Sequence, residues 1–567
     1  MYIERVPNRN SRPALLLREA WREGKTVRKR TLANLTDWPA AKVEALRRVL
    51  RGEVLGSPRE LFTIEQSVPH GHVEAILSTV RRLGLETLIA AKRCRERDRV
   101  LALLVERLLH PCSKLATTRL WDTTTLATEL GVQGATEDDV YAAMDWLAAR
   151  QARIEGKLAQ RHLAEGARVF YDVSSSGYEG RTCPLAQFGH DRDGKKGLPV
   201  IVYGVLTDEA GRPVAMQVYP GDTGDPTTVP DQVETLRERF GLARVVLVGD
   251  RGMLTEAQLE TLRQFPGVGW ISALRGLAIR ELAESGSLQL SLFDTRNLAE
   301  ITAPDYPGER LIACFNPLLA EERRRKRHAL LEATEQAFAA IAREVARRRK
   351  TPLTAAEIGV KVGRVRNRFK VGKHFELTIE DGGFQWGRRE AAIRRESALD
   401  GIYVIRTSEP QGHLSPEGTV RTYKRLALVE RVFRCLKGID LRVRPIHHRT
   451  ATRVRAHFFL CLLAYYVEWH MREALRPLLF DDEQLEQDRQ TRDPVAPARS
   501  SPSAKRKKAV RRTADGLPIH SFGTLLLSLG TRCRNTCRMR SDPAAPRFQQ
   551  LTEPTPLQAR ALELLKV

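Results

Sequence analysis

Val245-Val246-Leu247-Val248-Gly249-Asp250 is an uninterrupted apolar run that ends in a glycine and an acid. Four such residues without polar alternation are typical of a strand that is buried on both faces. Ligands of open α/β sheets bind beyond the carboxyl ends of strands, where Asp250 lies. The stretch therefore predicts a sheet covered by helices, with Asp250 at a binding edge.

The segments on either side extend this sheet. Strands are expected at 169–173, 198–206 and 213–219 before the run, and at 270–274 and 401–406 after it. A helix over 229–240 and the capping box Thr255-x-x-Gln258 alternate with these strands, which indicates a mixed α/β sheet. Asp172 falls inside the first strand. A carboxylate there is costly unless it is paired, for example with an arginine, or binds a cation.

A third acid lies on a helix expected over 423–437. Tyr423, Glu430 and Lys437 are spaced by seven residues and share one face of that helix. Another face is apolar, with Leu426, Val429, Phe433 and Leu436 at intervals of three and four. A single carboxylate in a cationic patch suits a metal ion beside a phosphodiester. The alternative is an amphipathic surface helix with internal ion pairs.

Composition narrows the class of protein. The chain has 567 residues, a net charge of +24 and a pI of about 10.0, which favour several domains and a nucleic-acid partner. Eight scattered cysteines without CxxC pairs argue against a zinc ribbon and for reduced thiols in the cytoplasm. No signal peptide is recognised, and the apolar run 458–467 is too short to span a bilayer, so no membrane partner is expected.

The changes in pattern divide the chain into seven segments. We expect a small β-rich segment at 1–58, a helical candidate DNA-binding region at 59–165, two core parts at 166–275 and 401–480, an inserted basic subdomain at 276–400, a basic flexible linker at 481–516 and a tail at 517–567.

The three acids have a shared chemistry if they converge. Asp172, Asp250 and Glu430 would offer open carboxylate oxygens, which suit two Mg²⁺ ions, with Mn²⁺ as an alternative. Two metals about 4 Å apart can activate a nucleophilic oxygen and stabilise the leaving oxygen of a phosphodiester.

Several stretches together resemble the DDE transposases of insertion sequences, in the IS4-like group and its IS1634-like branch. The matching stretches are Tyr171-Asp172-Val173-Ser174-Ser175, Gly189-His190-Asp191-Arg192-Asp193-Gly194-Lys195-Lys196-Gly197, Tyr219-Pro220-Gly221-Asp222-Thr223-Gly224-Asp225, Val248-Gly249-Asp250-Arg251-Gly252-Met253 and Val429-Glu430-x-x-Phe433-Arg434-x-Leu436-Lys437. The resemblance implies an RNase H-like fold with an insertion before the last acid. It also implies that Asp172, Asp250 and Glu430 are the catalytic, metal-binding triad.

The resemblance further implies a function and partners. Members cut double-stranded DNA at terminal inverted repeats and join the freed 3′-OH to target DNA, as a homodimer in the synaptic complex. This would occur in the bacterial cytoplasm, with the protein on the nucleoid when it is bound to DNA. The other hypotheses are a transposase-derived DNA-binding protein without activity, and a recombinase with a covalent Ser or Tyr intermediate.

The family pattern Tyr-x2-Arg-x3-Glu-x6-Lys is met at Tyr423, Glu430 and Lys437, but Leu426 occupies the Arg position. Tyr423, Arg425, Arg434 and Lys437 are therefore the candidate DNA contacts. Two other motifs receive plainer interpretations. Asp191-x-Asp193-Gly194 lacks the Glu that would end a calcium loop and is expected to be a solvated turn. His447-His448-Arg449 is expected to be exposed, with phosphate contact as the alternative.

Overall fold

The centre of the molecule is an eight-stranded sheet, seen here in a computed structural model that describes residues 1–9, 11–53, 62–195, 197–540 and 544–567. Its strands run in the order β10-β11-β14-β9-β8-β5-β6-β7. The bounds are β5 Ala167–Gly177, β6 Val200–Thr207, β7 Pro213–Tyr219, β8 Val245–Val248, β9 Val268–Ala273, β10 Leu298–Ile301, β11 Arg310–Phe315 and β14 Ile402–Thr407. The predicted mixed α/β sheet is thus present.

Two directions of pairing meet at β5. β5, β8 and β9 are parallel neighbours, whereas β5, β6 and β7 form an antiparallel meander. All four residues of β8 are buried, as its apolar run predicts. Helix α17 (Leu426–Lys437) packs against β5 and β6, and helix α18 (Ala451–Leu475) packs against β7. These contacts bring the helix that carries Glu430 over the first strand of the sheet.

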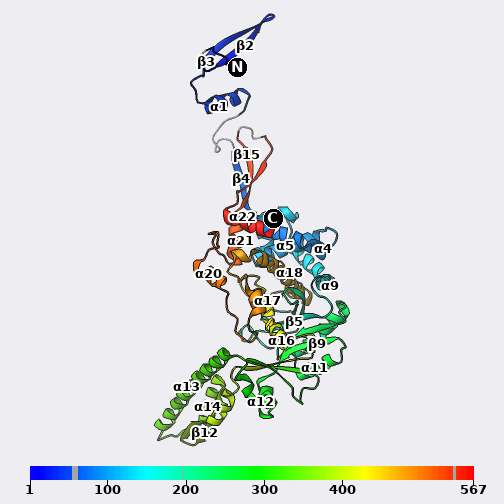
Figure 1. Ribbon diagram of the computed structural model, residues 1–567, viewed down its shortest axis with the longest axis vertical. Coiled ribbons are helices and arrows are strands. Elements are labelled where there is room, and N and C mark those ends of the chain that lie inside the picture. The colour runs from blue at the N-terminus through cyan, green and yellow to red at the C-terminus, as the bar shows by residue number, and fades with distance from the viewer. Residues whose placement is uncertain (10, 54–61, 196, 541–543) are drawn as a thin grey trace.

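The helical region before the sheet joins the same hydrophobic core. Helices α5 (Arg95–Leu109) and α8 (Glu137–Ala148) pack against the apolar helix α18, which comes three hundred residues later. The smaller helices of this region are α3 Gly71–Arg82, α4 Leu85–Ile89, α6 Lys114–Leu120, α7 Leu126–Leu130 and α9 Gln151–His162. Figure 1 shows this bundle stacked on one end of the sheet. In the described residues no helix has both the length and the apolar character needed to cross a membrane.

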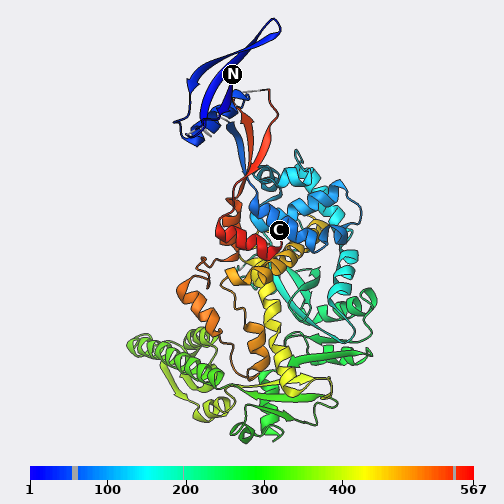
Figure 2. The same cartoon turned by 45° about the horizontal axis from the view of Figure 1, so that its top comes forward.

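A separate unit interrupts the sheet between β11 and β14. These strands are antiparallel neighbours, with Phe315 opposite Ile402, so the intervening residues extend what would otherwise be a hairpin. The unit contains α13 Pro317–Arg347, α14 Ala355–Phe369, β12 Phe375–Glu380, β13 Gly383–Arg388 and α15 Glu390–Ser397. It has its own apolar cluster around Phe338 and lies to one side of the core in Figure 2.

The boundaries of this unit differ from the sequence-based expectation. Residues 276–400 were predicted to form the inserted subdomain, but α12 (Gly276–Glu284) packs on β14, and β10 and β11 belong to the main sheet. The strands at 298–301 and 310–315 are short, and only their pairing with β14 assigns them to the core.

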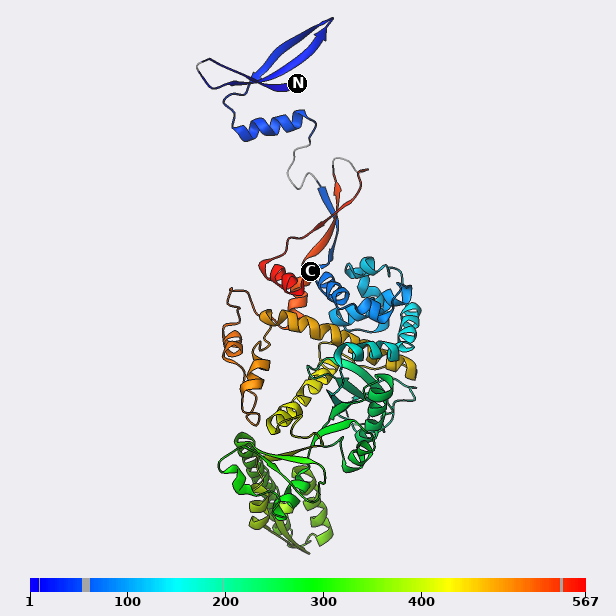
Figure 3. The same ribbon diagram turned by 45° about the vertical axis from the view of Figure 1, so that its right-hand side comes forward.

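The two ends of the chain meet in a small sheet, β16-β15-β4. β4 (Phe62–Pro69) pairs with β15 (Cys533–Met539), which pairs with β16 (Phe548–Leu551). The predicted tail therefore completes an N-terminal element. Helices α21 (Phe522–Gly530) and α22 (Pro556–Leu565) pack on α3, as Figure 3 allows the reader to follow.

The remaining N-terminal segment and the predicted linker also contain regular structure. β1 (Tyr2–Val6), β2 (Ala14–Glu23) and β3 (Thr26–Asn34) form an antiparallel sheet that precedes α1 (Ala40–Leu50). The predicted boundary at 58–59 lies outside the described residues. The stretch 481–516, expected to be flexible, contains α19 (Leu485–Thr491) and α20 (Pro502–Val510). Ser501 caps α20 and also forms hydrogen bonds to Asp482, which anchors the start of this helix.

Candidate active site at the edge of the central sheet

Asp172 and Asp250 follow equivalent positions of two neighbouring parallel strands. Phe170 on β5 is paired in register with Val248 on β8, and each acid lies two residues further along its chain. Side chains alternate along a strand, so Asp172 and Asp250 project from the same face of the sheet. Asp250 lies just beyond the end of β8, and its negative charge is one of the causes that raise the pKa of Asp172, so the two carboxylates lie near each other.

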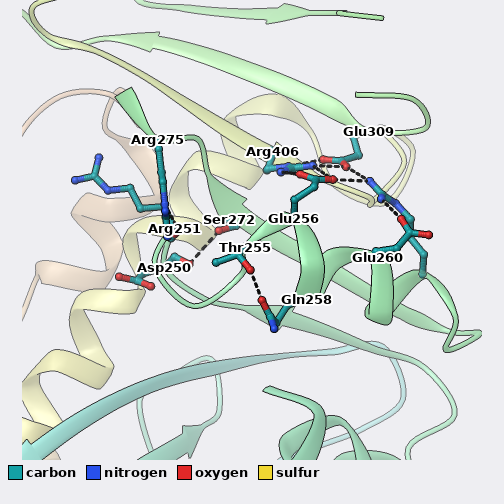
Figure 4. Close-up of polar contacts among 11 residues, drawn as sticks. Asp250, Arg251, Thr255, Glu256, Gln258, Glu260, Ser272, Arg275, Glu309 and Arg406 are labelled. Carbon is teal, nitrogen blue, oxygen red and sulfur yellow. Dashed lines mark hydrogen bonds and ion pairs between the residues drawn. The ribbon is translucent and has the colours of Figure 1, made fainter. Parts of the chain in front are cut away.

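The loop after β8 holds Asp250 in place. Its Oδ1 accepts hydrogen bonds from the backbone N–H groups of Gly252 and Met253, both at 2.8 Å. Ser272 on β9 donates from its hydroxyl to the Asp250 carbonyl at 3.2 Å, as Figure 4 shows. Asp250 is nevertheless exposed, so its second oxygen remains accessible to a ligand.

Asp172 lies in a less polar setting. It is half-buried, and its Oδ1 accepts a 2.7 Å hydrogen bond from the Val173 N–H. The pKa of Asp172 is raised from 3.8 to about 7, chiefly by burial and also by the negative charges of Asp250 and Asp225, against the Val173 hydrogen bond and the charge of Arg192. A carboxyl group in this state releases its proton readily when a cation binds beside it.

The third acid, Glu430, lies on helix α17, which packs against β5. Glu430 is exposed on α17 and has no hydrogen bond or ion pair with any described residue. Burial and the charges of Asp250, Glu430 and Asp172 raise the pKa of Tyr423 to about 12. All three carboxylates therefore act electrostatically on one phenol.

The helix that carries this motif is broken where one helix was predicted. α16 (Pro416–Lys424) ends at Lys424 and α17 begins at Leu426, so Tyr423 and Glu430 lie on different helices. The predicted apolar face is buried at Val429, Phe433 and Leu436.

The spacing of the carboxylates bears on which metals would fit. Among the described residues, one set of three potential ligands has all its ligand atoms within 4.8 Å of one another, namely Cys435, Asp440 and Glu468. Asp172, Asp250 and Glu430 are spread more widely than that set. Carboxylate oxygens are hard donors of the kind that Mg²⁺ and Mn²⁺ prefer.

The predicted cationic residues have different environments. Arg425 faces away from the acids, because it donates to the Glu209 carbonyl at 2.7 Å and pairs with Glu486. Arg434 is exposed and forms no side-chain hydrogen bond or ion pair within the described ranges. Lys437 is enclosed, with its ammonium 2.6 Å from the Ser175 carbonyl and 3.1 Å from Asp193.

Asp193 corrects one sequence-based expectation. It was predicted to lie in a solvated turn, but its side chain is 2% exposed and pairs with Lys437 and with Arg444 at 2.9 Å. It also accepts a 3.0 Å hydrogen bond from the Gly177 N–H at the end of β5. The loop thereby ties the strand of Asp172 to the helix of Glu430.

Arg192 and Asp225 are further residues near Asp172 that were not among the predicted site residues; Asp225 was expected to shape a turn, with a role near the metals as the alternative. They pair with each other, and both act electrostatically on Asp172. Arg192 Nη1 is buried without a hydrogen-bond partner. Both residues lie in stretches that carry the family resemblance, and this resemblance is the feature of the sequence that could have pointed to them.

An ion-pair network centred on the buried Arg406 lies next to the loop of Asp250. Arg406 on β14 makes two 2.6 Å hydrogen bonds to Glu309 and one of 2.7 Å to Glu256, the first residue of α11 (Glu256–Arg263). Figure 4 shows this network next to the turn that contains Asp250 and Arg251. It fixes the start of α11 relative to β14.

Comparisons with known proteins agree with this arrangement. A family model described as "Transposase DDE domain" matches residues 179–467, just over half of the chain, and one for the "IS1634 family transposase, N-terminal domain" matches residues 3–59. The first match contains Asp250 and Glu430 and begins seven residues after Asp172. No curated protein matches.

A solved structure, the cryo-EM structure of the piggyBac transposase synaptic complex with hairpin DNA, is similar at a TM-score of 0.35 and 11% identity over 70% of this chain and 72% of that one. That likeness is too low to support a structural argument. The family models decide the identity: the chain belongs to the DDE transposases, in the IS1634 family.

Proposed function

We propose that this transposase binds the ends of its element, cleaves DNA phosphodiesters there and joins the 3′-OH ends to target DNA. In this proposal Asp172, Asp250 and Glu430 hold two divalent metal ions, Mg²⁺ or Mn²⁺. The observation that carries it is the in-register placement of Asp172 and Asp250, with Glu430 close enough to act on the same tyrosine.

The fold supports the assignment of a catalytic core. The strand order β7-β6-β5-β8-β9, with an antiparallel meander followed by two parallel strands, is the topology expected of an RNase H-like sheet. Asp172 lies on the first strand, Asp250 follows the fourth, and Glu430 lies on a helix after the insertion. This is the order of acids that the family resemblance implies.

The residues of the chain have separable roles in the proposed reaction. Two backbone N–H groups fix Asp250, the Val173 N–H fixes Asp172, and the packed face of α17 holds Glu430. Bound divalent cations would stabilise the negative charge that develops on the attacking and leaving oxygens. In this proposal Arg434, which is exposed and whose side chain has no partner among the described residues, contacts a DNA phosphate beside them.

A cavity of about 530 Å³ offers a route for the DNA backbone. It lies where α12 and the separate unit face Tyr423 and Arg251. The basic residues that line it are Arg251, Arg280, Arg323, Lys326, Arg327 and Lys373. The lining also contains Asp400 and Glu396, which pair with Arg327 and Lys373. In this proposal the other four cations of the lining attract the phosphate backbone.

The test is cleavage of a duplex that carries the DNA flanking the coding region. Asp250→Asn is expected to bind this duplex about as tightly as the unaltered protein and to lose cleavage. Asp294→Asn, which changes an exposed acid away from the site, is the matched control and should cleave normally.

A chelator should abolish cleavage by the unaltered protein, and Mg²⁺ should restore it. Retained cleavage in Asp250→Asn would defeat the triad assignment. DNA binding without cleavage under every metal condition would favour a transposase-derived DNA-binding protein. A homodimer in the synaptic complex is part of the proposal and is tested by light scattering with and without the duplex.

A further inference from the structure

A second basic cavity lies outside the carboxylate site. It has a volume of about 300 Å³ and lies between the end of α5, the start of α6 and the loop 442–448 that follows α17. Its cationic and imidazole side chains are those of Arg107, Lys114, Arg442, Arg444, His447, His448 and His457. No acidic residue lines it; Glu137 and Asp138 line a neighbouring hollow that shares Tyr141 and His448.

Lys114 is the most unusual member of this group. The residue is 4% exposed, and its ammonium has no hydrogen bond or ion pair with any described residue. Burial, and then the charge of Arg107, lowers its pKa from 10.5 to about 7. A buried lysine is normally paired, because removing an isolated charge from water is costly.

The neighbours of Lys114 leave its charge uncompensated. The Arg107 guanidinium contacts three carbonyls, those of Cys112, Leu441 and Arg442, each at 3.5 Å. These contacts are long, so the guanidinium is only weakly engaged. No carboxylate in the lining balances either cation.

Two of the histidines add unused nitrogen atoms. His457 bonds through Nε2 to the Val443 carbonyl at 2.9 Å, while its Nδ1 is buried without a partner. The His448 ring packs against the rings of His457 and Tyr141, at centroid distances of 5.0 and 6.0 Å, and its nitrogens have no partner in the described part of the chain. The pKa of both imidazoles is lowered, chiefly by burial and then by the charge of Lys114.

From this arrangement we infer that the cavity is a phosphate-binding site, in which a phosphate oxygen accepts from the Lys114 ammonium and the Arg107 guanidinium. The phosphate would supply the negative charge and the acceptor oxygens that the lining lacks. The cavity is large enough for a phosphate together with part of a nucleotide. Both a DNA backbone phosphate and a free phosphate have the required chemistry.

The site is connected to the carboxylate site through one residue. Arg444 lines the cavity, pairs with Asp193 and donates to the Lys437 carbonyl at 3.4 Å. Arg444 thus connects the cavity that contains Lys114 with the contacts that hold α17. In the His447-His448-Arg449 motif, expected to be exposed, His447 and Arg449 are exposed and His448 is half-buried, and both histidines line the cavity.

The test measures binding of inorganic phosphate to the full-length, metal-free protein in a phosphate-free buffer, by calorimetry and by thermal unfolding. The unaltered protein should bind phosphate and unfold at a higher temperature when phosphate is added. Lys114→Met should bind it at least about tenfold more weakly. The exposed Lys92→Met is the matched control and should respond like the unaltered protein.

Lys114→Met should fold, because it replaces an unpaired buried cation with an apolar side chain of similar length. Its unfolding temperature in phosphate-free buffer should equal or exceed that of the unaltered protein. His448→Gln provides a second variant with weakened phosphate binding. The assay needs no cleavage, so its outcome is independent of the proposed reaction.

Two arms distinguish the source of the phosphate. If the DNA backbone fills the cavity, a mixed-sequence duplex will compete with inorganic phosphate, and Lys114→Met will lower the slope of log affinity against log salt by about one. If a free phosphate fills it, phosphate and duplex will bind together. Absence of phosphate binding in the unaltered protein, or equal binding in Lys114→Met, would overturn the inference.

Discussion

Asp193 Oδ1 lies 3.1 Å from Lys437 Nζ, although 244 residues separate the two along the chain. The lysine of the family pattern therefore joins helix α17 to the loop after β5 through an enclosed ion pair. Its side chain is 16% exposed, and burial lowers its pKa even though Asp193 opposes that change. We therefore expect Lys437 to position the helix of Glu430, and its predicted contact with DNA stays a prediction.

Lys437→Met should lower the free energy of unfolding by on the order of 2–3 kcal/mol, because it leaves the buried Asp193 with Arg444 alone. Asp193→Asn should have a similar effect. The double variant should lose less than the sum of the two, and denaturant unfolding measures this coupling. Strict additivity would show that the ion pair does not stabilise the protein.

Asp172→Asn should stabilise the metal-free protein at alkaline pH. The folded state raises the pKa of Asp172 from 3.8 to about 7, so it binds the proton more tightly than the unfolded chain does. This contribution to stability is fully present below about pH 4 and is lost as the pH rises through about 7. Asparagine avoids that loss.

The advantage of Asp172→Asn should therefore grow between about pH 4 and about pH 7 and reach on the order of 2–4 kcal/mol. Thermal unfolding across this range measures it. Mg²⁺ should stabilise the unaltered protein at about pH 8 and have little effect on the variant. A pH-independent difference would show that Asp172 does not titrate in this range.

Arg406→Met should destabilise the core by on the order of 3–5 kcal/mol. The substitution leaves Glu309, whose side chain is 1% exposed, with Arg263 as its one remaining cation among the described residues. Arg406→Met combined with Glu309→Met should recover much of the loss, because both charges are then removed. Urea denaturation of the single and double variants decides this, and no recovery would point to a packing defect.

Replacing residues 317–400 with a two-residue turn should leave a folded core. The deletion joins β11 and β14, which already pair as antiparallel neighbours with Phe315 opposite Ile402. The shortened protein should unfold cooperatively but bind DNA more weakly and with a smaller salt slope, because it lacks Arg323, Lys326 and Lys373 of the large cavity. Unchanged DNA affinity would contradict the proposed DNA path.

Substitutions of Arg425 and Arg434 should have opposite effects on the unfolding temperature and on DNA affinity. Arg425→Gln breaks the contacts to Glu209 and Glu486 and should lower the unfolding temperature with little effect on DNA affinity. Arg434→Gln should weaken DNA binding and leave the unfolding temperature unchanged, because no described residue pairs with Arg434. Filter binding and thermal unfolding of both variants test this contrast, and the reverse pattern would exchange their roles.

The sequence predicted the parts of the fold that local pattern controls. The apolar run of β8, the first strand with Asp172 and the meander of β6 and β7 have the expected positions, because burial on one or both faces leaves a clear periodicity. The short strands β10 and β11 and the partner of β4 were not predicted. Their assignment depends on pairing between distant segments, which local pattern does not encode.

The residues of the candidate site also fall into those that local pattern points to and those that depend on distant segments. Asp172 and Asp250 could be singled out because they lie within and at the end of apolar strands, and Glu430 because it is the one carboxylate of a cationic helix. Asp193 and Lys114 could not, since a polar loop residue and a lysine at a helix start give no local sign of burial. Their environments arise from Lys437, Arg444 and the loop after α17, far away in sequence.

The pairing of β4 with β15 has a consequence for synthesis on the ribosome. The strand at Phe62–Pro69 emerges early, but its partner at Cys533–Met539 is translated hundreds of residues later. A nascent polypeptide must therefore carry an open strand edge through most of its elongation. Premature termination upstream of β15 would release a product with that edge uncovered, a target for quality-control proteases and for unintended pairing with other chains.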